Sequence, residues 1–220
     1  MNRIIFLLIF VTGGVGLTYY ITLMSEKEDP LPVFNPVDIE DEMVDSTLLR
    51  KGMGHTIGEF SFYNQNGKVV DNEDVEGKVY VAEYFFTTCG SICPKMNKQL
   101  QRIHNKFAKN KEVKLLSFTV DPDKDTVEQM KKYAERFNVE GNQWHFLTGD
   151  KESLYQLART SFFVLKPAEA ENQGDAGGDF IHTNNFVLVD RRGRIRGYYD
   201  GTSAIEVDKI MRDISRLLKE

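Results

Sequence analysis

The amino-acid sequence predicts an α/β domain in which helices flank a mixed β-sheet. Three observations support this prediction: apolar runs of strand length, segments whose apolar residues recur at helical spacing, and a late pair of strands joined by a tight turn. Strands and helices alternate along most of the chain, and no internal repeat interrupts them. This order of elements is typical of an α/β protein.

The predicted domain begins with a strand at 56–64, where apolar and polar residues alternate, and "QNG" after it signals a turn. A buried-strand run covers 78–88, and a helix is expected at 93–110 because one apolar stripe runs along it. The stripe consists of Met96, Leu100, Ile103 and Phe107. We interpret Met96 as a core residue of this helix, although its sulfur is also a conceivable metal donor.

The rest of the predicted domain continues the alternation and ends in a strand pair. The expected elements are strands at 112–121 and 144–150, helices at 125–138 and 151–163, a strand pair at 183–201 and a closing helix at 203–220. The strand pair is expected to turn at Arg192 and Gly193. Thr126 and Gln129 are three residues apart, which predicts a capping box at the start of the helix at 125–138.

The composition is that of a globular protein and argues against nucleic-acid binding. Hydrophobic residues make up 41% of the 220, charged residues 28%, and the net charge is −5. Basic residues are interleaved with acidic ones, without a clustered Lys/Arg tract that contains aromatic residues. Two cysteines are too few for a disulfide scaffold, and a domain of this size needs none. We therefore interpret the cysteine pair as chemical rather than structural.

The first 24 residues predict a transmembrane anchor. No charge occurs between Ile4 and Met24, which is roughly the 20 residues that a helix needs to cross a bilayer. Arg3 precedes the run and acidic residues dominate after it, so the positive-inside rule places the N-terminus in the cytoplasm. A cleaved signal peptide is the alternative, but no small-x-small cleavage pattern follows the apolar run.

Three regions follow from these patterns: an anchor at 1–24, an extracytoplasmic linker at 25–55 and a folded domain at 56–220. The linker is predicted from Pro30, Pro32 and Pro36, which stand among acidic residues with little periodicity. The N-terminus begins directly with the apolar run and lacks an Arg/Ser-rich transit peptide. We therefore expect a single-pass protein of a bacterial inner membrane, with its C-terminal domain in the periplasm.

Cys89 and Cys93 are either a redox couple or part of a metal site. The preceding strand should deliver Cys89 to the carboxyl edge of the sheet, where open α/β sheets place ligands. Pro94 suits the first turn of a helix, which puts Cys93 at a helix N-terminus, where thiolate is favoured over thiol. The neighbouring Gly90 and Ser91 predict an exposed loop.

Four histidines could complete a metal site with the two thiolates, a donor set that suits copper or zinc. His104 is expected about 16 Å along the helix from Cys93, too far to share an ion with it. His55 and His145 are interpreted as surface or packing residues. His182 stands between an acidic, glycine-rich loop and a strand, and from its position alone a ligand role stays open.

Four segments in this order resemble the Sco/SenC family: "YFFTTCGSICPKMNKQL", "SFTVDPDKDTVEQM", "WHFLTGD" and "FIHTNNFVLVDRRGRI". The resemblance runs from about Ile57 to the C-terminus. It implies a thioredoxin-like fold, with Cys89, Cys93 and His182 as ligands for Cu(I) or Cu(II). It also implies that Asp121 is an acidic residue near the site, although a strand-end turn role for Asp121 is an equally good interpretation.

Two functions remain open at this point. The resemblance implies a metallochaperone that delivers copper to, or matures, the copper centre of cytochrome c oxidase; its partner would be the copper-bearing oxidase subunit or another copper or thiol protein. The alternative is an extracytoplasmic thiol–disulfide oxidoreductase, with Cys89 and Cys93 as its redox pair. A peroxidase is disfavoured because "VAEYFFTT" before Cys89 contains no proline.

Overall fold

The computed structural model describes residues 13–20, 29–39, 44, 53–139, 141–164 and 183–220. The chain divides into two units, Met1–Leu31 and Pro32–Glu220. In the first, residues 13–20 are helical. No helix among the described residues is both long enough and apolar enough to cross a bilayer. Most of the anchor predicted at 1–24 lies outside the described residues.

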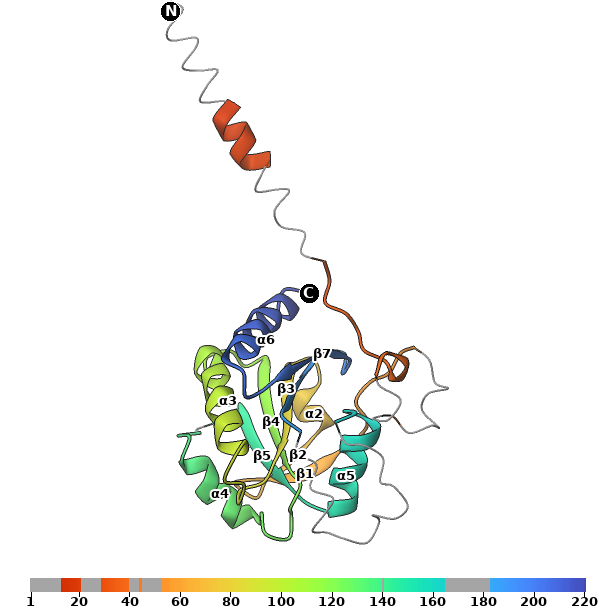
Figure 1. The fold of residues 1–220 in the computed structure, drawn as a ribbon, viewed down its shortest axis with the longest axis vertical. Coiled ribbons are helices and arrows are strands. Elements are labelled where there is room, and N and C mark those ends of the chain that lie inside the picture. Colours follow the sequence, from red (N-terminus) through yellow and green to blue (C-terminus); the bar gives the residue numbers. More distant parts are fainter. Residues whose placement is uncertain (1–12, 21–28, 40–43, 45–52, 140, 165–182) are drawn as a thin grey trace, which may run out of the picture. The chain divides into compact units, whose positions relative to one another are not determined.

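In the second unit, the described residues form a seven-stranded sheet in the order β2-β1-β5-β4-β3-β6-β7 (Figure 1). The strands are β1 (Ser61–Asn64), β2 (Val69–Asp71), β3 (Val79–Phe85), β4 (Val113–Thr119), β5 (Trp144–Thr148), β6 (Asn185–Val189) and β7 (Ile195–Asp200). The three central strands β3, β4 and β5 are parallel, and the outer strands pair antiparallel. The predicted mixed sheet is therefore confirmed.

Helices cover both faces of this sheet. They are α2 (Asn72–Val75), α3 (Cys93–Phe107), α4 (Val127–Glu135), α5 (Lys151–Thr160) and α6 (Ala204–Leu217), and a 3₁₀ turn, η1, spans Pro36–Asp38. Figure 1 shows α3 beside α6, and the two helices are in contact. The strand β2 and the helix α2 were not predicted, because three- and four-residue elements are too short to show a periodicity.

The central strands are buried on both faces, which explains their continuous apolar runs. All seven residues of β3 are buried; Tyr80, Ala82 and Tyr84 belong to one hydrophobic cluster that also includes residues of α5. On the other face the Phe85 ring contacts Tyr133 of α4, with centroids 5.4 Å apart. The two-sided packing fixes the end of β3 in place, and the cysteines follow that end.

Part of the segment predicted as a linker belongs to the folded unit. Phe34 forms an antiparallel bridge with Ile195 of β7. The Asn35 side chain accepts hydrogen bonds from the backbone N–H groups of Gly54, at 2.9 Å, and His55, at 3.3 Å. Val44 is buried, with 2% of its surface exposed. The compact unit accordingly begins at Pro32.

Candidate dithiol and metal site

The sheet delivers the cysteine loop to its carboxyl edge, as predicted. The strand β3 ends at Phe85, three residues earlier than expected, and a loop leads from there to α3, whose first residue is Cys93. The backbone N–H of Cys89 donates to the Phe86 carbonyl at 3.2 Å, which closes a turn just after the strand. The N–H of Val120 donates to the Phe85 carbonyl at 2.9 Å, so the loop begins beside the end of β4.

Both cysteines are free thiols and both are buried, with 8% of Cys89 and 3% of Cys93 exposed. Gly90 and Ser91 between them are exposed. The prediction of an exposed loop was therefore right for Gly90 and Ser91 and wrong for the two cysteines, which are buried. The Cys89 Sγ lies 3.7 Å from the Ser91 Oγ, within hydrogen-bonding reach for sulfur.

The two thiols differ in acidity, and Cys93, which the helix N-terminus was predicted to favour as a thiolate, is the less acidic of the two. Burial opposes ionisation of Cys89, but hydrogen bonds from the backbone and side chains of Cys93 and Ser91 together outweigh it and lower the pKa of Cys89 to about 7. Burial raises the pKa of the Cys93 thiol well above its ordinary value, and the charges of Cys89 and Glu83 raise it further. Desolvation of Cys93 thus overrides its favourable position at a helix N-terminus.

The predicted third ligand, His182, lies outside the described residues. The chain is described again from Thr183, which is buried, and β6 begins at Asn185. Within the described part of the chain, no three His, Cys, Asp or Glu side chains are grouped so that they could hold a metal ion. The ligand role of His182 therefore stays a prediction.

The other three histidines pack within the domain, as expected. The His55 Nε2 lies 2.8 Å from the Ser161 carbonyl oxygen. The His104 ring packs near Trp144, with ring centroids 5.9 Å apart. The His145 side chain is buried on β5, and burial lowers its pKa to about 4.

Asp121 lies at the end of β4, and its side chain is 8% exposed. One carboxylate oxygen forms an ion pair with the Lys124 ammonium at 3.1 Å, and the Asp121 N–H donates to the Thr119 hydroxyl at 2.9 Å. These contacts suit the strand-end turn interpretation. A role of Asp121 beside the metal ligands stays a prediction.

Two buried acidic residues near the site were not singled out from the sequence. The Asp125 carboxylate is 0% exposed and accepts hydrogen bonds from Thr87 and Thr119, and burial raises its pKa despite them. Glu83 is also 0% exposed, and burial raises its pKa to about 8 although Ser117 donates a hydrogen bond to it. The sequence did contain one signal for Glu83: it is a charged residue within the otherwise apolar run that predicts the strand.

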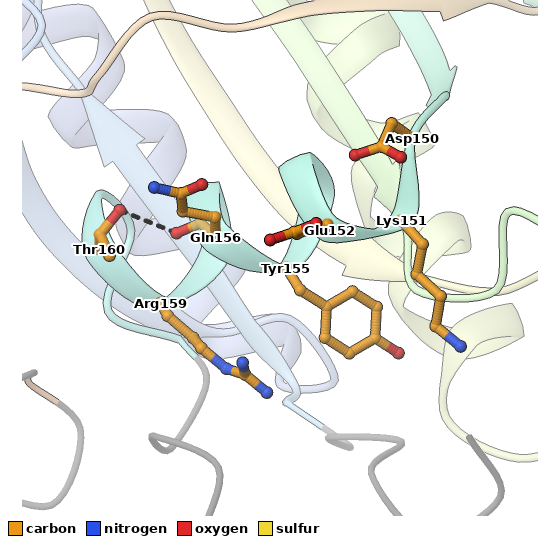
Figure 2. Close-up of a pocket in the computed structure, with 7 residues that line it drawn as sticks. All are labelled: Asp150, Lys151, Glu152, Tyr155, Gln156, Arg159 and Thr160. Carbon is orange, nitrogen blue, oxygen red and sulfur yellow. Dashed lines mark hydrogen bonds between the residues drawn. The ribbon is translucent and has the colours of Figure 1, made fainter. Parts of the chain in front are cut away.

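A surface pocket lies on α5, outside the cysteine loop (Figure 2). Its lining residues are Asp150, Lys151, Glu152, Tyr155, Gln156, Arg159 and Thr160. The Lys151 ammonium and the Arg159 guanidinium each lie 5.7 Å from the centre of the Tyr155 ring. The Tyr155 hydroxyl donates to the Val120 carbonyl at 2.8 Å, which ties α5 to the end of β4. Acidic and basic groups are balanced here, so the pocket shows no preference for a charged ligand.

Comparison with known proteins assigns the family. The SCO1/SenC family model matches residues 50–219, which include both cysteines, Asp121 and His182. The chain belongs to the SCO1/SenC family. A curated relative, the SCO1 protein homolog of Bacillus subtilis, is 33% identical over 169 residues, which cover 76% of this chain and 84% of the relative. The resemblance inferred from the four segments is confirmed.

Solved SCO1/SenC structures also share the fold, which is thioredoxin-like, as the resemblance implied. BsSco, described as a member of the Sco family of cytochrome c oxidase assembly proteins with a disulfide switch, is 31% identical, covers 76% of this chain and 95% of its own, and has a TM-score of 0.64. ScoI of Bradyrhizobium japonicum, solved with copper bound, is 26% identical, covers 74% of this chain and 99% of its own, and has a TM-score of 0.56.

Proposed function

We propose that this chain is a membrane-anchored copper metallochaperone that delivers copper to, or matures, the copper centre of cytochrome c oxidase. One observation carries the proposal: the chain's two free thiols lie near each other at the carboxyl edge of the sheet, with Cys89 in the loop after β3 and Cys93 at the first residue of α3. The copper-bound ScoI relative and the description of BsSco as an oxidase assembly protein support it.

The donor chemistry of the pair fits copper as a cargo. Soft thiolates select Cu(I), and an added imidazole suits copper in either valence. Cys89 loses its proton near neutral pH, whereas Cys93 has to be deprotonated by the incoming metal. A site with two thiolates and one imidazole leaves copper with few ligands, so that an acceptor protein can displace them.

The register of β6 supports His182 as the third ligand. In the antiparallel pair of β3 and β6, Ala82 lies opposite Val187 and Tyr80 lies opposite Val189. The start of β6 is therefore directed toward the end of β3, from which the cysteine loop leaves. His182 is three residues before Asn185, the first residue of β6. We therefore include His182 in the proposed ligand set, with Asp121 as an acidic neighbour.

The proposed location is a bacterial inner membrane with the copper domain in the periplasm. The uncharged run from Ile4 to Met24, with Arg3 before it and acidic residues after it, supports a single N-terminal span. The proposed acceptor is the copper-bearing subunit of cytochrome c oxidase or another copper or thiol protein that meets the domain outside the membrane.

Copper titration of the reduced protein tests this function. The parent protein is expected to bind one copper ion tightly and to show a sulfur-to-copper absorption band as Cu(II). His182→Ala should weaken binding at least about tenfold, since a ligand is lost. His104→Ala is the matched control, because this histidine packs near Trp144, and it should bind as the parent does. Equal binding by both variants would remove His182 from the site, and no binding by the parent would reject the chaperone function.

A second function, thiol–disulfide exchange, is favoured by the unequal acidity of the two thiols. Cys89 is the more exposed and has the lower pKa, which suits the attacking thiolate, while the more buried Cys93 suits the resolving thiol. Reduction of a model disulfide peptide tests it. Cys89→Ser should abolish the reaction, whereas Cys93→Ser should trap a mixed disulfide on Cys89. An exchange rate for the parent no higher than that of free cysteine would argue against this function.

A further inference from the structure

We propose that Asp125 is the positioning residue of the dithiol site: its buried carboxylate ties the loop that carries Cys89 to the end of β4. Asp125 is 0% exposed and touches neither sulfur through any of its hydrogen bonds. It acts on Cys89 through Thr87, two residues earlier in the chain. The inference deepens the proposed function, because it concerns what holds the same site in shape.

The contacts of Asp125 join two segments that are far apart in the sequence. The backbone N–H of Thr87 donates to both carboxylate oxygens, at 3.1 and 3.3 Å, and the Thr87 hydroxyl donates to one of them at 2.5 Å. The Thr119 hydroxyl at the end of β4 donates to the other oxygen at 2.5 Å. A single side chain therefore fixes both the backbone and the side chain of Thr87.

Asp125 is itself held rigidly, which a positioning group requires. Its backbone N–H donates to the Asp121 carbonyl at 2.8 Å, within the turn between β4 and α4. The next residue, Thr126, is the N-cap of α4 and accepts a hydrogen bond from the Gln129 N–H. The Gln129 side chain then donates to the Thr87 hydroxyl at 3.1 Å, so α4 holds the loop through a second contact.

The position of the Cys89 sulfur depends on the contact between Thr87 and Asp125. After Thr87 the chain has only Thr88 before Cys89, whose N–H closes the turn to Phe86. A loop anchored at Thr87 keeps the Cys89 sulfur within 3.7 Å of the Ser91 hydroxyl. Without the Asp125 carboxylate, Thr87 would lose three hydrogen bonds to buried acceptor atoms. The Cys89 sulfur would then move away from the Ser91 hydroxyl.

The equilibrium of the two thiols with glutathione tests the proposal without copper. In this reaction the Cys89 and Cys93 thiols form a disulfide and pass two electrons and two protons to glutathione disulfide, which becomes two glutathione molecules. Asp125→Ala should displace the equilibrium constant about tenfold toward the protein disulfide, since the reduced pair loses its support. In Asp125→Asn the equilibrium constant should stay within about twofold of the parent value. The amide oxygen can still accept from the Thr87 N–H, and the amide can donate to or accept from the Thr87 and Thr119 hydroxyls.

Asp213→Ala is the matched control. Asp213 is also a buried carboxylate, 5% exposed, and it accepts a hydrogen bond from the Tyr199 hydroxyl at 2.8 Å and pairs with Arg216, both outside the cysteine loop. This variant should lower the melting temperature as Asp125→Ala does and leave the glutathione equilibrium unchanged. An equal displacement in Asp213→Ala, or an unchanged constant in folded Asp125→Ala, would overturn the proposal. So would an Asp125→Asn protein that behaves like Asp125→Ala, because the charge rather than the geometry would then matter.

Thr87→Val keeps the inference testable where Asp125→Ala does not fold. Valine preserves the buried shape of Thr87 but removes the hydroxyl that contacts Asp125 and Gln129. The equilibrium should then move severalfold in the same direction, and no movement would contradict the proposal. In the copper titration, Asp125→Ala should shift the wavelength of the sulfur-to-copper absorption band, whereas Asp213→Ala should not. If the parent binds no copper, the proposed function fails and the glutathione result still decides the role of Asp125.

Discussion

Cys89 and Cys93 are four residues apart in the sequence, yet the pKa of the Cys89 thiol lies below its ordinary value and that of the Cys93 thiol lies above it. Hydrogen bonds from the Cys93 and Ser91 groups lower the pKa of Cys89 although burial opposes them. Burial dominates at Cys93 and raises its pKa. Cys89 is therefore expected to react with electrophiles before Cys93 and to be the first of the two to ionise as pH rises.

Alkylation should distinguish the two thiols. In Cys93→Ser the remaining Cys89 should react with iodoacetamide with a half-maximal rate near pH 7, because its pKa is about 7. Cys89→Ser leaves Cys93, which should react far more slowly at this pH because its thiol is protonated. Mass spectrometry of timed samples measures both rates. Faster reaction of Cys93 than of Cys89 at pH 7 would contradict the assignment of the nucleophile.

Copper affinity should rise with pH in a defined range. Between about pH 7.5 and 9, Cys89 is ionised and Cys93 still carries a proton. Binding of Cu(I) to both sulfurs then releases one proton, so the affinity should increase about tenfold for each pH unit. A competition titration against a Cu(I) chelator measures this slope. A flat profile would show that Cys93 is not a ligand or is already ionised.

Glu83 should make the folded protein less stable as pH rises. Burial raises its pKa in the folded protein from 4.5 to about 8, so between these values the folded state binds the proton and the unfolded state does not. The stability contribution of protonated Glu83 is therefore complete below pH 4.5 and lost by about pH 8, on the order of a few kcal/mol. Urea denaturation at pH 5 and pH 8 measures the change. Glu83→Gln should abolish most of it, and the same change in this variant would assign it to other groups.

Arg196 should hold the N-terminal segment of the folded unit in place. Its side chain is buried and bonds to the carboxylates of Asp190 and Glu220 and to the Pro32 carbonyl. Arg196→Leu leaves the buried Asp190 with one partner fewer and should cost about 2–4 kcal/mol of the free energy of unfolding. Chemical denaturation measures this loss.

The control for Arg196 is Arg102→Leu. Arg102 forms an ion pair with Asp208 at 2.6 Å, but both side chains are well exposed, at 41% and 50%. Exposed ion pairs contribute little, so this variant should lose less than about 1 kcal/mol. Similar losses in the two variants would show that burial of the Arg196 network is unimportant.

Most of the fold could be predicted from the sequence, because its elements are long enough to show a period. The helix α3 follows from the stripe that contains Met96 and Leu100, and β3 follows from a continuous apolar run. The capping box predicted at Thr126 and Gln129 is half confirmed: the Thr126 side chain accepts from the Gln129 N–H. The short β2 and α2 elements carry no such signal.

For the candidate site, the sequence by itself determined that Cys89 follows a strand, that Cys93 begins the next helix, and that a SCO1/SenC pattern surrounds them. It could not determine the acidity of either thiol, since that depends on burial against segments that are distant in the chain. Nor could it reveal that Asp125 bonds to Thr87, 38 residues away. Tertiary structure decided both, because desolvation and these hydrogen bonds arise only when the loop packs against the end of β4 and the start of α4.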